Sequence, residues 1–106
     1  MIVVVFRNRI QPAAEEAYRE AAQTIVPTAM EVPGYLSHKV FSAEDGERVT
    51  IVEYASEDAM KVWGRDPRHV EVKKLGRQSF YSEYKVQVCN LIRERSFSRE
   101  AAEART

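Results

Sequence analysis

The stretch PGYLSHKVFSAEDGERVTIVEYASEDAMKVWG, residues 33–64, decides the fold. Its opening Pro-Gly pair is a turn signal, and the residues at 35–41 that follow favour a strand. The Asp-Gly pair at 45–46 suits a tight hairpin turn, because such turns require positive φ values. A second strand is expected at 49–54, so this part of the chain predicts an antiparallel hairpin that leads into a helix.

The helix after the hairpin is expected to break near Trp63, the only tryptophan of the chain. Ser56 is a good N-cap, and the helix that it starts carries Trp63 on its apolar face. Gly64 interrupts the pattern, and Asp66-Pro67 has the form of a second N-cap followed by proline in the first helical turn. The restarted helix is expected to end at Gly76, in a C-cap.

The flanking segments complete the pattern of strands and helices. The apolar run at 2–6 favours a first strand, and the alternation at 80–88 favours a last one. Pro12 opens a helix between the first two strands, and Pro27 is expected to kink or end it. The apolar stripe of this helix should face a core and consists of Ala14, Ala17, Tyr18, Ala21, Ile25 and Met30.

The order of the elements is β-α-β-β-α-β, which predicts an α+β, ferredoxin-like fold with a four-stranded antiparallel sheet and helices on one face. Apolar residues recur on both faces of the first and third strands, so the bare face of the sheet should pair with a second copy. We expect this domain at residues 1–92, followed by a polar tail or short helix at 93–106.

The composition indicates a single folded domain without a polyanionic partner. The 106 residues carry 16 basic and 16 acidic side chains, so no overall charge attracts nucleic acid or an anionic membrane. Basic residues do gather at 65–77, where they could attract an anionic small molecule or form a solvated helix face. Cys89 is the only cysteine, which favours a reducing compartment. The apolar run at the start is too short to span a bilayer, so a cytoplasmic protein is expected.

Four segments occur in a characteristic order along the chain: VVVFRNRI, PGYLSHKVF, VTIVEYAS and EDAMKVWGRDPRH. In this order they resemble the antibiotic biosynthesis monooxygenase (ABM) family, and the resemblance covers roughly residues 1–89. It implies a sheet-to-sheet homodimer, a dimeric α/β barrel, with a pocket in each subunit between sheet and helices. The family includes cofactor-independent oxygenases of aromatic polyketides, heme-degrading oxygenases and proteins without an established substrate.

The resemblance also implies a set of working residues. In the heme-degrading branch these are an asparagine at the end of the first strand, a tryptophan on the second helix and an iron-ligating histidine further along that helix. Asn8 and Trp63 match the first two. The third position falls near Val72 or Lys73, about one helical turn, or about 5.4 Å, beyond His69. Heme is therefore an alternative, the first expectation is no cofactor, and no metal site is predicted.

Each of these residues also has an ordinary structural role. Asn8 would either shape the turn after a strand or present its amide to a substrate oxygen. Trp63 is a core anchor and also a wall for a flat aromatic substrate, and the two roles are compatible. His69 lies near the start of the restarted helix, where the dipole favours neutral imidazole. It is either a base for a phenol or enol proton or a half-buried structural histidine.

Tyr81 and Tyr84 are candidate substrate-binding residues, because each could present a phenol to a cavity, although aromatic strand residues usually pack. Strand alternation predicts that they face opposite sides of the sheet, so that at most one points at the pocket. His38 has no potential metal ligand at suitable spacing and is interpreted as structural. The chain contains no phosphate loop, nucleotide fingerprint or serine-elbow motif, which favours chemistry without a nucleotide cofactor.

Three functions are compatible with these patterns. The first is a cofactor-independent monooxygenase that oxidises an aromatic or quinol-like small molecule, with Asn8, Trp63 and His69 as catalytic residues. The second is heme binding and degradation in the same pocket. The third is a non-catalytic dimeric module that only sequesters a metabolite.

Overall fold

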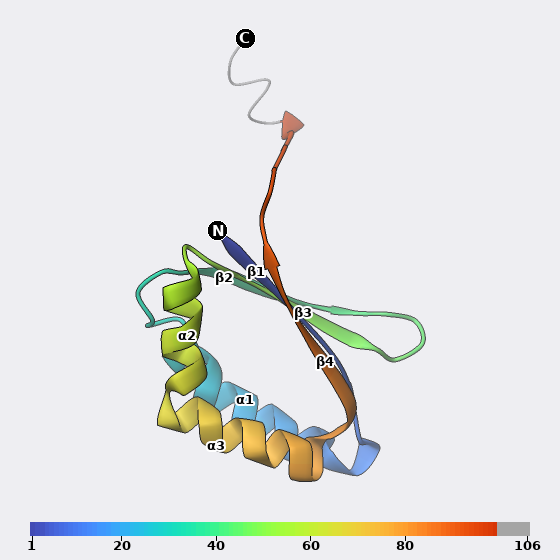
Figure 1. Cartoon of the computed structure of the whole chain (residues 1–106). Helices are drawn as coiled ribbons and strands as arrows, with labels where there is room; N and C mark the ends of the chain where they lie inside the picture. The colour runs from blue at the N-terminus through green and yellow to red at the C-terminus, as the bar shows by residue number, and fades with distance from the viewer. Residues whose placement is uncertain (100–106) are drawn as a thin grey trace.

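The computed structural model describes residues 1–99 and contains one antiparallel sheet with all of its helices on one side (Figure 1). The elements, in chain order, are β1 (Ile2–Ile10), η1 (Pro12–Ala14), α1 (Glu15–Ala29), β2 (Tyr35–Ser42), β3 (Arg48–Tyr54), α2 (Glu57–Arg65), α3 (Pro67–Leu75), η2 (Gly76–Phe80) and β4 (Tyr81–Asn90). The strands lie in the order β2-β3-β1-β4, and each neighbouring pair is antiparallel. This is the ferredoxin-like α+β arrangement that the order of elements predicts.

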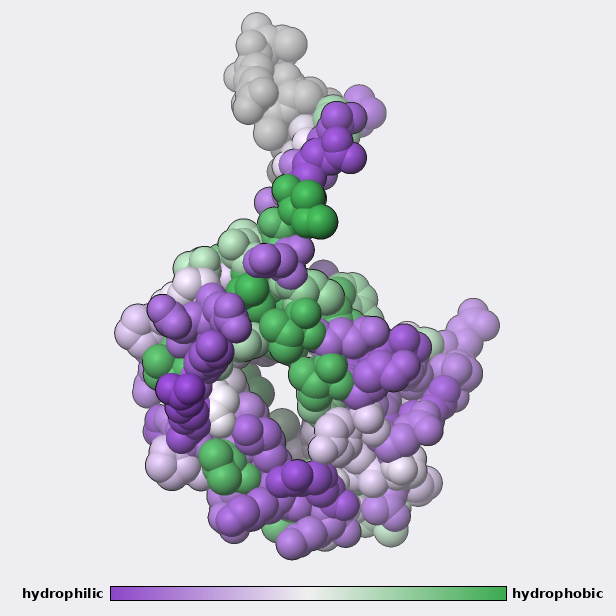
Figure 2. Space-filling view, in the orientation of Figure 1, coloured by the Kyte–Doolittle hydropathy of each residue, from purple (hydrophilic) through white to green (hydrophobic). Residues whose placement is uncertain are grey.

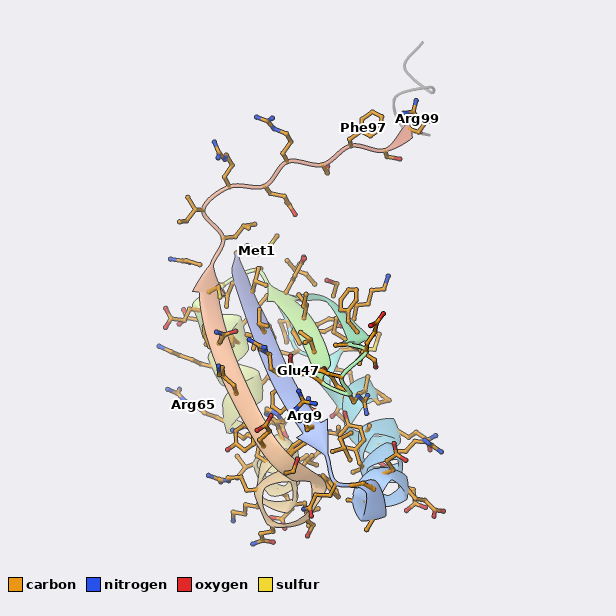
Figure 3. The ribbon with its side chains drawn as sticks, turned by 90° about the vertical axis from the view of Figure 1, so that its right-hand side faces the viewer. Met1, Arg9, Glu47, Arg65, Phe97 and Arg99 are labelled. Atoms are coloured by element: carbon orange, nitrogen blue, oxygen red, sulfur yellow. The ribbon has the colours of Figure 1, made fainter. Side chains whose placement is uncertain are left out.

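The first strand continues past its apolar run because its polar half is paired on both sides. Arg7 makes a bidentate contact with Glu47, with nitrogen–oxygen distances of 3.1 and 2.9 Å. Arg9 contacts Asp45 at 2.8 Å and Glu83 at 2.9 Å. These charged groups lie on the outer face of the sheet, away from the helices (Figure 3). Partners from β4 and from the β2–β3 hairpin therefore extend a strand that local sequence alone would end earlier.

The buried core lies between one end of the sheet and α2. Ile2, Tyr54, Ala59 and Trp63 form its central cluster. Ser56 caps α2 as predicted, because its hydroxyl accepts a hydrogen bond of 3.1 Å from the amide of Ala59. The cap fixes where the helix begins and so which of its residues meet the sheet.

The second helix breaks close to the predicted position, although Gly64 itself stays helical. α2 ends at Arg65, and α3 begins at Pro67. Asp66 lies between them and caps α3, since its carboxylate accepts a hydrogen bond of 2.9 Å from the amide of Arg68. The two helices are therefore separate elements that meet at a single extended residue.

Pro27 does not end the first long helix, which was one of the two outcomes expected for it. α1 continues through Pro27 and ends at Ala29. The amide hydrogen that proline lacks would have served only the last turn, so its loss does not stop the helix there. Met30 was expected to belong to the apolar stripe of this helix. It lies at the C-cap instead and is 55 % exposed, so it is not part of the stripe.

Gly76 is the C-cap of α3, as predicted, and it also serves close packing. Its φ of -56° is helical, and the chain continues from it through the wide turn η2 to Phe80. A Cβ on Gly76 would lie 2.7 Å from Cε2 of Tyr81, so any larger residue would displace that ring. Gly76 therefore makes room for a cavity-lining tyrosine.

The last strand carries a bulge opposite β1. Arg9 pairs with Glu83, but Ile10 pairs with Tyr81, so Ser82 is the extra residue. An extra residue shifts the alternation of side chains by one, which brings Tyr81 to the same side as Tyr84. Their ring centroids lie 5.9 Å apart. The prediction that these tyrosines face opposite sides of the sheet is therefore wrong.

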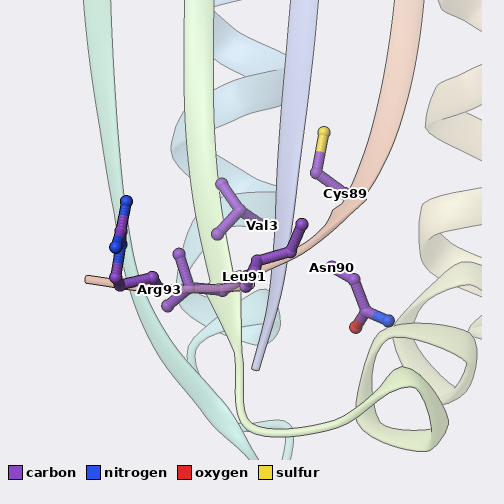
Figure 4. A pocket seen from close by; sticks show the side chains of 6 residues that line it. Val3, Cys89, Asn90, Leu91 and Arg93 are labelled. Atoms are coloured by element: carbon purple, nitrogen blue, oxygen red, sulfur yellow. The ribbon is translucent and has the colours of Figure 1, made fainter.

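The chain leaves the sheet after β4 and runs outward as an extended segment, residues 91–99, which we call the C-terminal arm (Figure 1). Ile92 is 97 % exposed and Phe97 is 74 % exposed. An open depression of about 730 Å³ lies where the arm begins, bordered by Val3 and Cys89 (Figure 4). The remainder of the predicted tail, residues 100–106, lies outside the described residues. Within residues 1–99, no helix is long and apolar enough to cross a membrane.

Substituting Gly34 should test the packing of the turn before β2. Its φ is +93°, and a Cβ there would lie only 2.6 Å from the Cβ of Ala59 on α2. Gly34→Ala combines backbone strain with a collision against a helix, so we expect the free energy of unfolding to fall by about 2 kcal/mol or more. Urea denaturation measures this loss.

Gly46→Ala is the matched control for that measurement. Gly46 has a nearly identical φ of +91°, but the nearest atom to its added Cβ is Nη1 of Arg9 at 3.7 Å. The free energy of unfolding of Gly46→Ala should therefore fall only by the cost of backbone strain, about 1 kcal/mol. Equal losses in the two variants would show that the contact with Ala59 contributes nothing.

Candidate functional site

A cavity of about 960 Å³ lies between the inner face of the sheet and the helices. Figure 2 shows its opening in the middle of the molecule, with apolar side chains at the rim. The walls come from all four strands and from α1, α2, α3 and η2. The volume lies within the usual range for a small-molecule pocket. The helices and the sheet thus enclose a chamber where a solid core would otherwise form.

Trp63 and His69 stack on each other at the junction of α2 and α3. Their ring centroids lie 4.5 Å apart, with an interplanar angle of 15°. Nδ1 of His69 lies 3.1 Å from the carbonyl oxygen of Trp63. A carbonyl oxygen can only accept, so Nδ1 carries the hydrogen and the lone pair of the neutral ring is on Nε2. Both side chains line the cavity.

The surroundings of His69 keep its ring neutral. Burial lowers the pKa of His69 below its ordinary value of 6.5, and the positive charge of Lys73 acts in the same direction. The hydrogen bond to the Trp63 carbonyl and the charge of Asp66 oppose this shift but do not reverse it. Near neutral pH, His69 can therefore accept a proton at Nε2.

A second imidazole borders the cavity from the sheet. His38 and Val40 occupy alternate positions of β2 and both line the cavity. The hydroxyl of Tyr35 forms a hydrogen bond with Nδ1 of His38. Tyr35 in turn meets Tyr54 edge-on, with centroids 6.4 Å apart. The interpretation of His38 as merely structural missed this site, although strand alternation with Val40 was a usable signal.

Both tyrosines behind His38 keep their hydroxyl hydrogens. Burial raises the pKa of Tyr35, and it raises the pKa of Tyr54 to about 12, with a smaller contribution from neighbouring Tyr35. A phenol that stays protonated is a hydrogen-bond donor at any pH near neutrality. This part of the wall is therefore polar but uncharged.

The other end of the cavity is aromatic. Phe6 stacks on Tyr84, with centroids 5.9 Å apart, and lies 5.5 Å from the ring of Tyr81. Tyr18 meets Tyr81 at 6.0 Å, and the guanidinium of Arg48 lies 4.9 Å from the Tyr18 centroid. Burial raises the pKa of Tyr81, which lines the cavity. Tyr84 is 45 % exposed and contacts the wall through Phe6.

Asn8 is buried at this aromatic end, apart from the Trp63 cluster. It is 2 % exposed, and its cross-strand neighbours are Arg48 and Tyr84. Its Oδ1 has no hydrogen-bond partner within residues 1–99, a situation that costs about 1–3 kcal/mol. Along the strand Asn8 is about 20 Å from Ile2, a member of the core cluster that also contains Trp63. Trp63 and His69 both line the cavity, whereas Asn8 is not among its lining residues.

Basic side chains outnumber acidic ones around the cavity. Glu15 is the one acidic residue of the lining, whereas five lining residues are basic: Arg19, Arg48, Lys61, Arg65 and Lys73. The whole chain has a formal net charge of zero, so this excess is local. It favours a ligand that is anionic or becomes anionic on binding.

The position that the resemblance gives to an iron-ligating histidine holds no histidine in this chain. The positions one turn beyond His69 are Val72 and Lys73, and neither offers an imidazole. The amine of Lys73 instead donates to the carbonyl of Gly64 at 2.9 Å. Within the described part of the chain, no group of three or more His, Cys, Asp or Glu side chains could hold a metal ion.

Comparisons with known sequences connect this site to a family. The sequence profile described as antibiotic biosynthesis monooxygenase matches residues 1–75, which include both Trp63 and His69. The uncharacterized protein YqjZ of Bacillus subtilis (strain 168) is 30 % identical over 94 residues. That match covers 89 % of this chain and 82 % of YqjZ.

Solved structures share the fold. Rv0793 from Mycobacterium tuberculosis superposes with a TM-score of 0.78 at 21 % identity, over 90 % of this chain and 98 % of that one. A monooxygenase from the ActVA-Orf6 gene of Streptomyces coelicolor, in complex with the ligand nanaomycin D, has a TM-score of 0.73 at 26 % identity, over 92 % of each chain. With its sheet, its break between α2 and α3 and its matching profile, the chain belongs to the antibiotic biosynthesis monooxygenase family.

Proposed function

We propose that the protein is a small monooxygenase that oxidises an aromatic or quinol-like molecule in the cavity without a bound cofactor. The observation that carries the proposal is the state of His69, which stacks on Trp63 and has its Nδ1 engaged by a carbonyl. This leaves an unprotonated Nε2 on a histidine that lines a cavity together with several aromatic rings. Such a nitrogen is suited to remove a proton from a flat, weakly acidic substrate.

The proposed reaction begins when Nε2 of His69 takes the proton of a phenol or enol. The resulting anion is rich in electrons and transfers one of them to molecular oxygen. The two radicals then combine to form a carbon–oxygen bond, and the imidazolium returns its proton to the distal oxygen. Loss of water from the hydroperoxide leaves a carbonyl. One oxygen atom enters the product, the other leaves as water, and the substrate carbon loses two hydrogens.

The remaining residues would bind and orient the substrate. Trp63 forms a flat wall, and the basic groups around the cavity stabilise the substrate anion. Tyr81 would hold the far ring at the aromatic end, and Tyr84 would support that wall through its stacking on Phe6. The unpaired Oδ1 of buried Asn8, which lies behind the lining, would accept a hydrogen bond from a bound water there.

We also propose that two copies pair through the outer face of the sheet. Among residues 1–99 no helix covers this face, as Figure 3 shows, and Phe41 on it is 47 % exposed. The pairing of the strands places apolar side chains together on this face: Val3, Val5, Phe41, Val49 and Ile51. A patch of this kind on a sheet is usually covered by a partner. We place the dimer in the cytoplasm, where the exposed thiol of Cys89 would stay reduced.

Replacing the base should abolish turnover without loss of the fold. We expect His69→Gln to lower the rate of oxygen consumption with an anthrone substrate by about a hundredfold or more, because glutamine can donate to the Trp63 carbonyl but cannot accept the proton. An oxygen electrode measures the rate, and circular dichroism checks the fold. Lys74→Gln, on the same helix but outside the cavity lining, is the control and should retain activity.

The decline of the reaction rate at low pH should reflect the protonation of His69. Its folded pKa is lowered, so the ring stays neutral as the pH falls through 6.5 and takes up a proton only below that value. Activity should therefore persist at pH 6.5 and decline at lower pH. A rate profile from about pH 5 to about pH 8 measures this decline. A midpoint at or above 6.5 would contradict the role of His69 as the base.

Two assays separate this proposal from the other two functions. Hemin titration should give no saturable Soret shift, because Val72 and Lys73 stand where an iron-ligating imidazole would be needed. A stoichiometric shift would favour the heme reading instead. If a tightly bound aromatic ligand is recovered unchanged after incubation in air, the protein is a binding module and the proposed oxidation is wrong.

The proposed dimer can be tested by one charge on the outer face. Ile51 lies on β3, a central strand, so Ile51→Glu would bury a carboxylate at the interface and should give a monomeric mass by light scattering. Gln78→Glu adds the same charge at an exposed position of η2 on the helical side and should leave the dimer intact. A monomeric mass for the unmodified chain at micromolar concentration would refute the dimer.

A further inference from the structure

We propose that the cavity offers two imidazoles in opposite tautomers, with His69 as the acceptor and His38 as the donor. It would then select a flat aromatic ligand that bears an acidic hydroxyl at one position and a carbonyl oxygen at another. This inference rests on the proposed function for the proton transfer to His69 and goes beyond it in naming the substrate class and a second polar residue.

The tautomer of His69 is set by its backbone hydrogen-bond partner. The Trp63 carbonyl lies 3.1 Å from Nδ1 and can only accept, so the hydrogen of the neutral ring is on Nδ1. Stacking at 4.5 Å on the Trp63 ring fixes the plane of the imidazole. Nε2 has no protein donor among the hydrogen bonds of residues 1–99 and therefore stays available for a ligand hydroxyl.

For His38 we assign the Tyr35 hydroxyl as the donor in its hydrogen bond with Nδ1. The hydroxyl of Tyr35 has one hydrogen, and within the described residues Nδ1 of His38 is its hydrogen-bond partner. Since burial raises the pKa of Tyr35, the phenol keeps this hydrogen. When Nδ1 of His38 accepts it, the hydrogen of the neutral imidazole is on Nε2. His38 is thus able to donate where His69 is able to accept.

The two rings enter the cavity from different walls, His38 from β2 and His69 from α3. Much of the wall between the strands is apolar, with Val4 and Val52 among its members. A polar group in such surroundings discriminates strongly, because a ligand that lacks the matching group leaves it unpaired. One ligand that satisfies both imidazoles must therefore carry a donor and an acceptor at separate positions.

This arrangement also suits the proposed proton transfer. In a conjugated hydroxy-ketone, loss of the hydroxyl proton moves negative charge onto the carbonyl oxygen. An N–H of His38 directed at that oxygen would stabilise the anion as it forms, while Nε2 of His69 holds the proton that was removed. His38 would then donate a hydrogen bond to the carbonyl oxygen of the neutral substrate. The same hydrogen bond would become stronger in the anion that forms from it.

Imidazole tautomers can be read directly by nitrogen-15 NMR. The chain has only two histidines, so a long-range proton–nitrogen spectrum of the labelled protein contains only these two rings. Above the imidazole pKa, we expect His69 with its hydrogen on Nδ1 and His38 with its hydrogen on Nε2. Two rings in the same tautomer, or reversed assignments, would overturn the proposal.

Tyr35→Phe tests the cause of the His38 tautomer. This variant removes the donor and should shift the nitrogen resonances of His38 while leaving those of His69 in place. Tyr54→Phe is the matched control: it also removes a hydroxyl from the cavity wall, but one that makes no hydrogen bond to either imidazole among the contacts of residues 1–99. Equal shifts of His38 in both variants would refute the assigned hydrogen bond.

Binding of 6-acetyl-2-naphthol, measured without oxygen by fluorescence titration, tests the ligand class. The wild type should bind it about three- to tenfold more tightly than 2-naphthol or 2-acetylnaphthalene, each of which lacks one group. His38→Phe should remove the advantage of the ketone, and His69→Phe should remove the advantage of the hydroxyl. Uniform weakening of all three ligands by His38→Phe would contradict the proposal.

These readouts are independent of turnover. If anthrone-type substrates consume no oxygen but the tautomers and the binding pattern are as expected, the proposed oxidation fails and the two-imidazole site stands. If His38→Phe does not fold, by circular dichroism, the nitrogen resonances of the wild type and of Tyr35→Phe still decide the assignment.

Discussion

The site depends on one carbonyl group at the end of α2, that of Trp63, which accepts a hydrogen bond from a side chain as well as one from the backbone. In a continuous helix the carbonyl of Trp63 would accept a hydrogen bond from the amide of residue 67, but that residue is Pro67, which has no amide hydrogen. The carbonyl instead accepts from Asp66 at 3.1 Å and from Nδ1 of His69 at 3.1 Å. The same break frees the carbonyl of Gly64, which accepts from Lys73. A single proline thus supplies the anchor that orients the proposed base and selects its tautomer.

Local signals predict most of the fold. The two turns, the Ser56 cap and the restart at Asp66 are each encoded within a few residues, and the structure contains all of them. The errors occur where distant parts of the chain meet. β1 extends because Arg7 and Arg9 find acidic partners in the turn between β2 and β3 and on β4, and the space beside the C-cap Gly76 is filled by the ring of Tyr81. Neither partner can be read from the sequence near these residues.

The candidate site is predictable to a smaller extent. Trp63 and His69 line the cavity as the sequence suggests, but their stacking and the carbonyl contact are consequences of the helix break. Metal-ligand spacing does not indicate a site at His38, whereas strand alternation with Val40 places it at the cavity. The resemblance grouped Asn8 with Trp63, yet the length of β1 separates them. The sequence thus indicated which residue types line the cavity better than it indicated which of those residues lie close together.

The bulge at Ser82 has a consequence for how this protein can vary. Before it, β4 directs Tyr81 into the cavity; after it, the strand resumes a regular pairing with β1. If Ser82 paired with Ile10 instead of being left unpaired, strict alternation would send Tyr81 to the opposite face and vacate the space that Gly76 leaves for its ring. The side chain at position 82 can therefore change, provided that this residue stays outside the pairing. In this strand, register constrains the chemistry of the cavity more tightly than composition does.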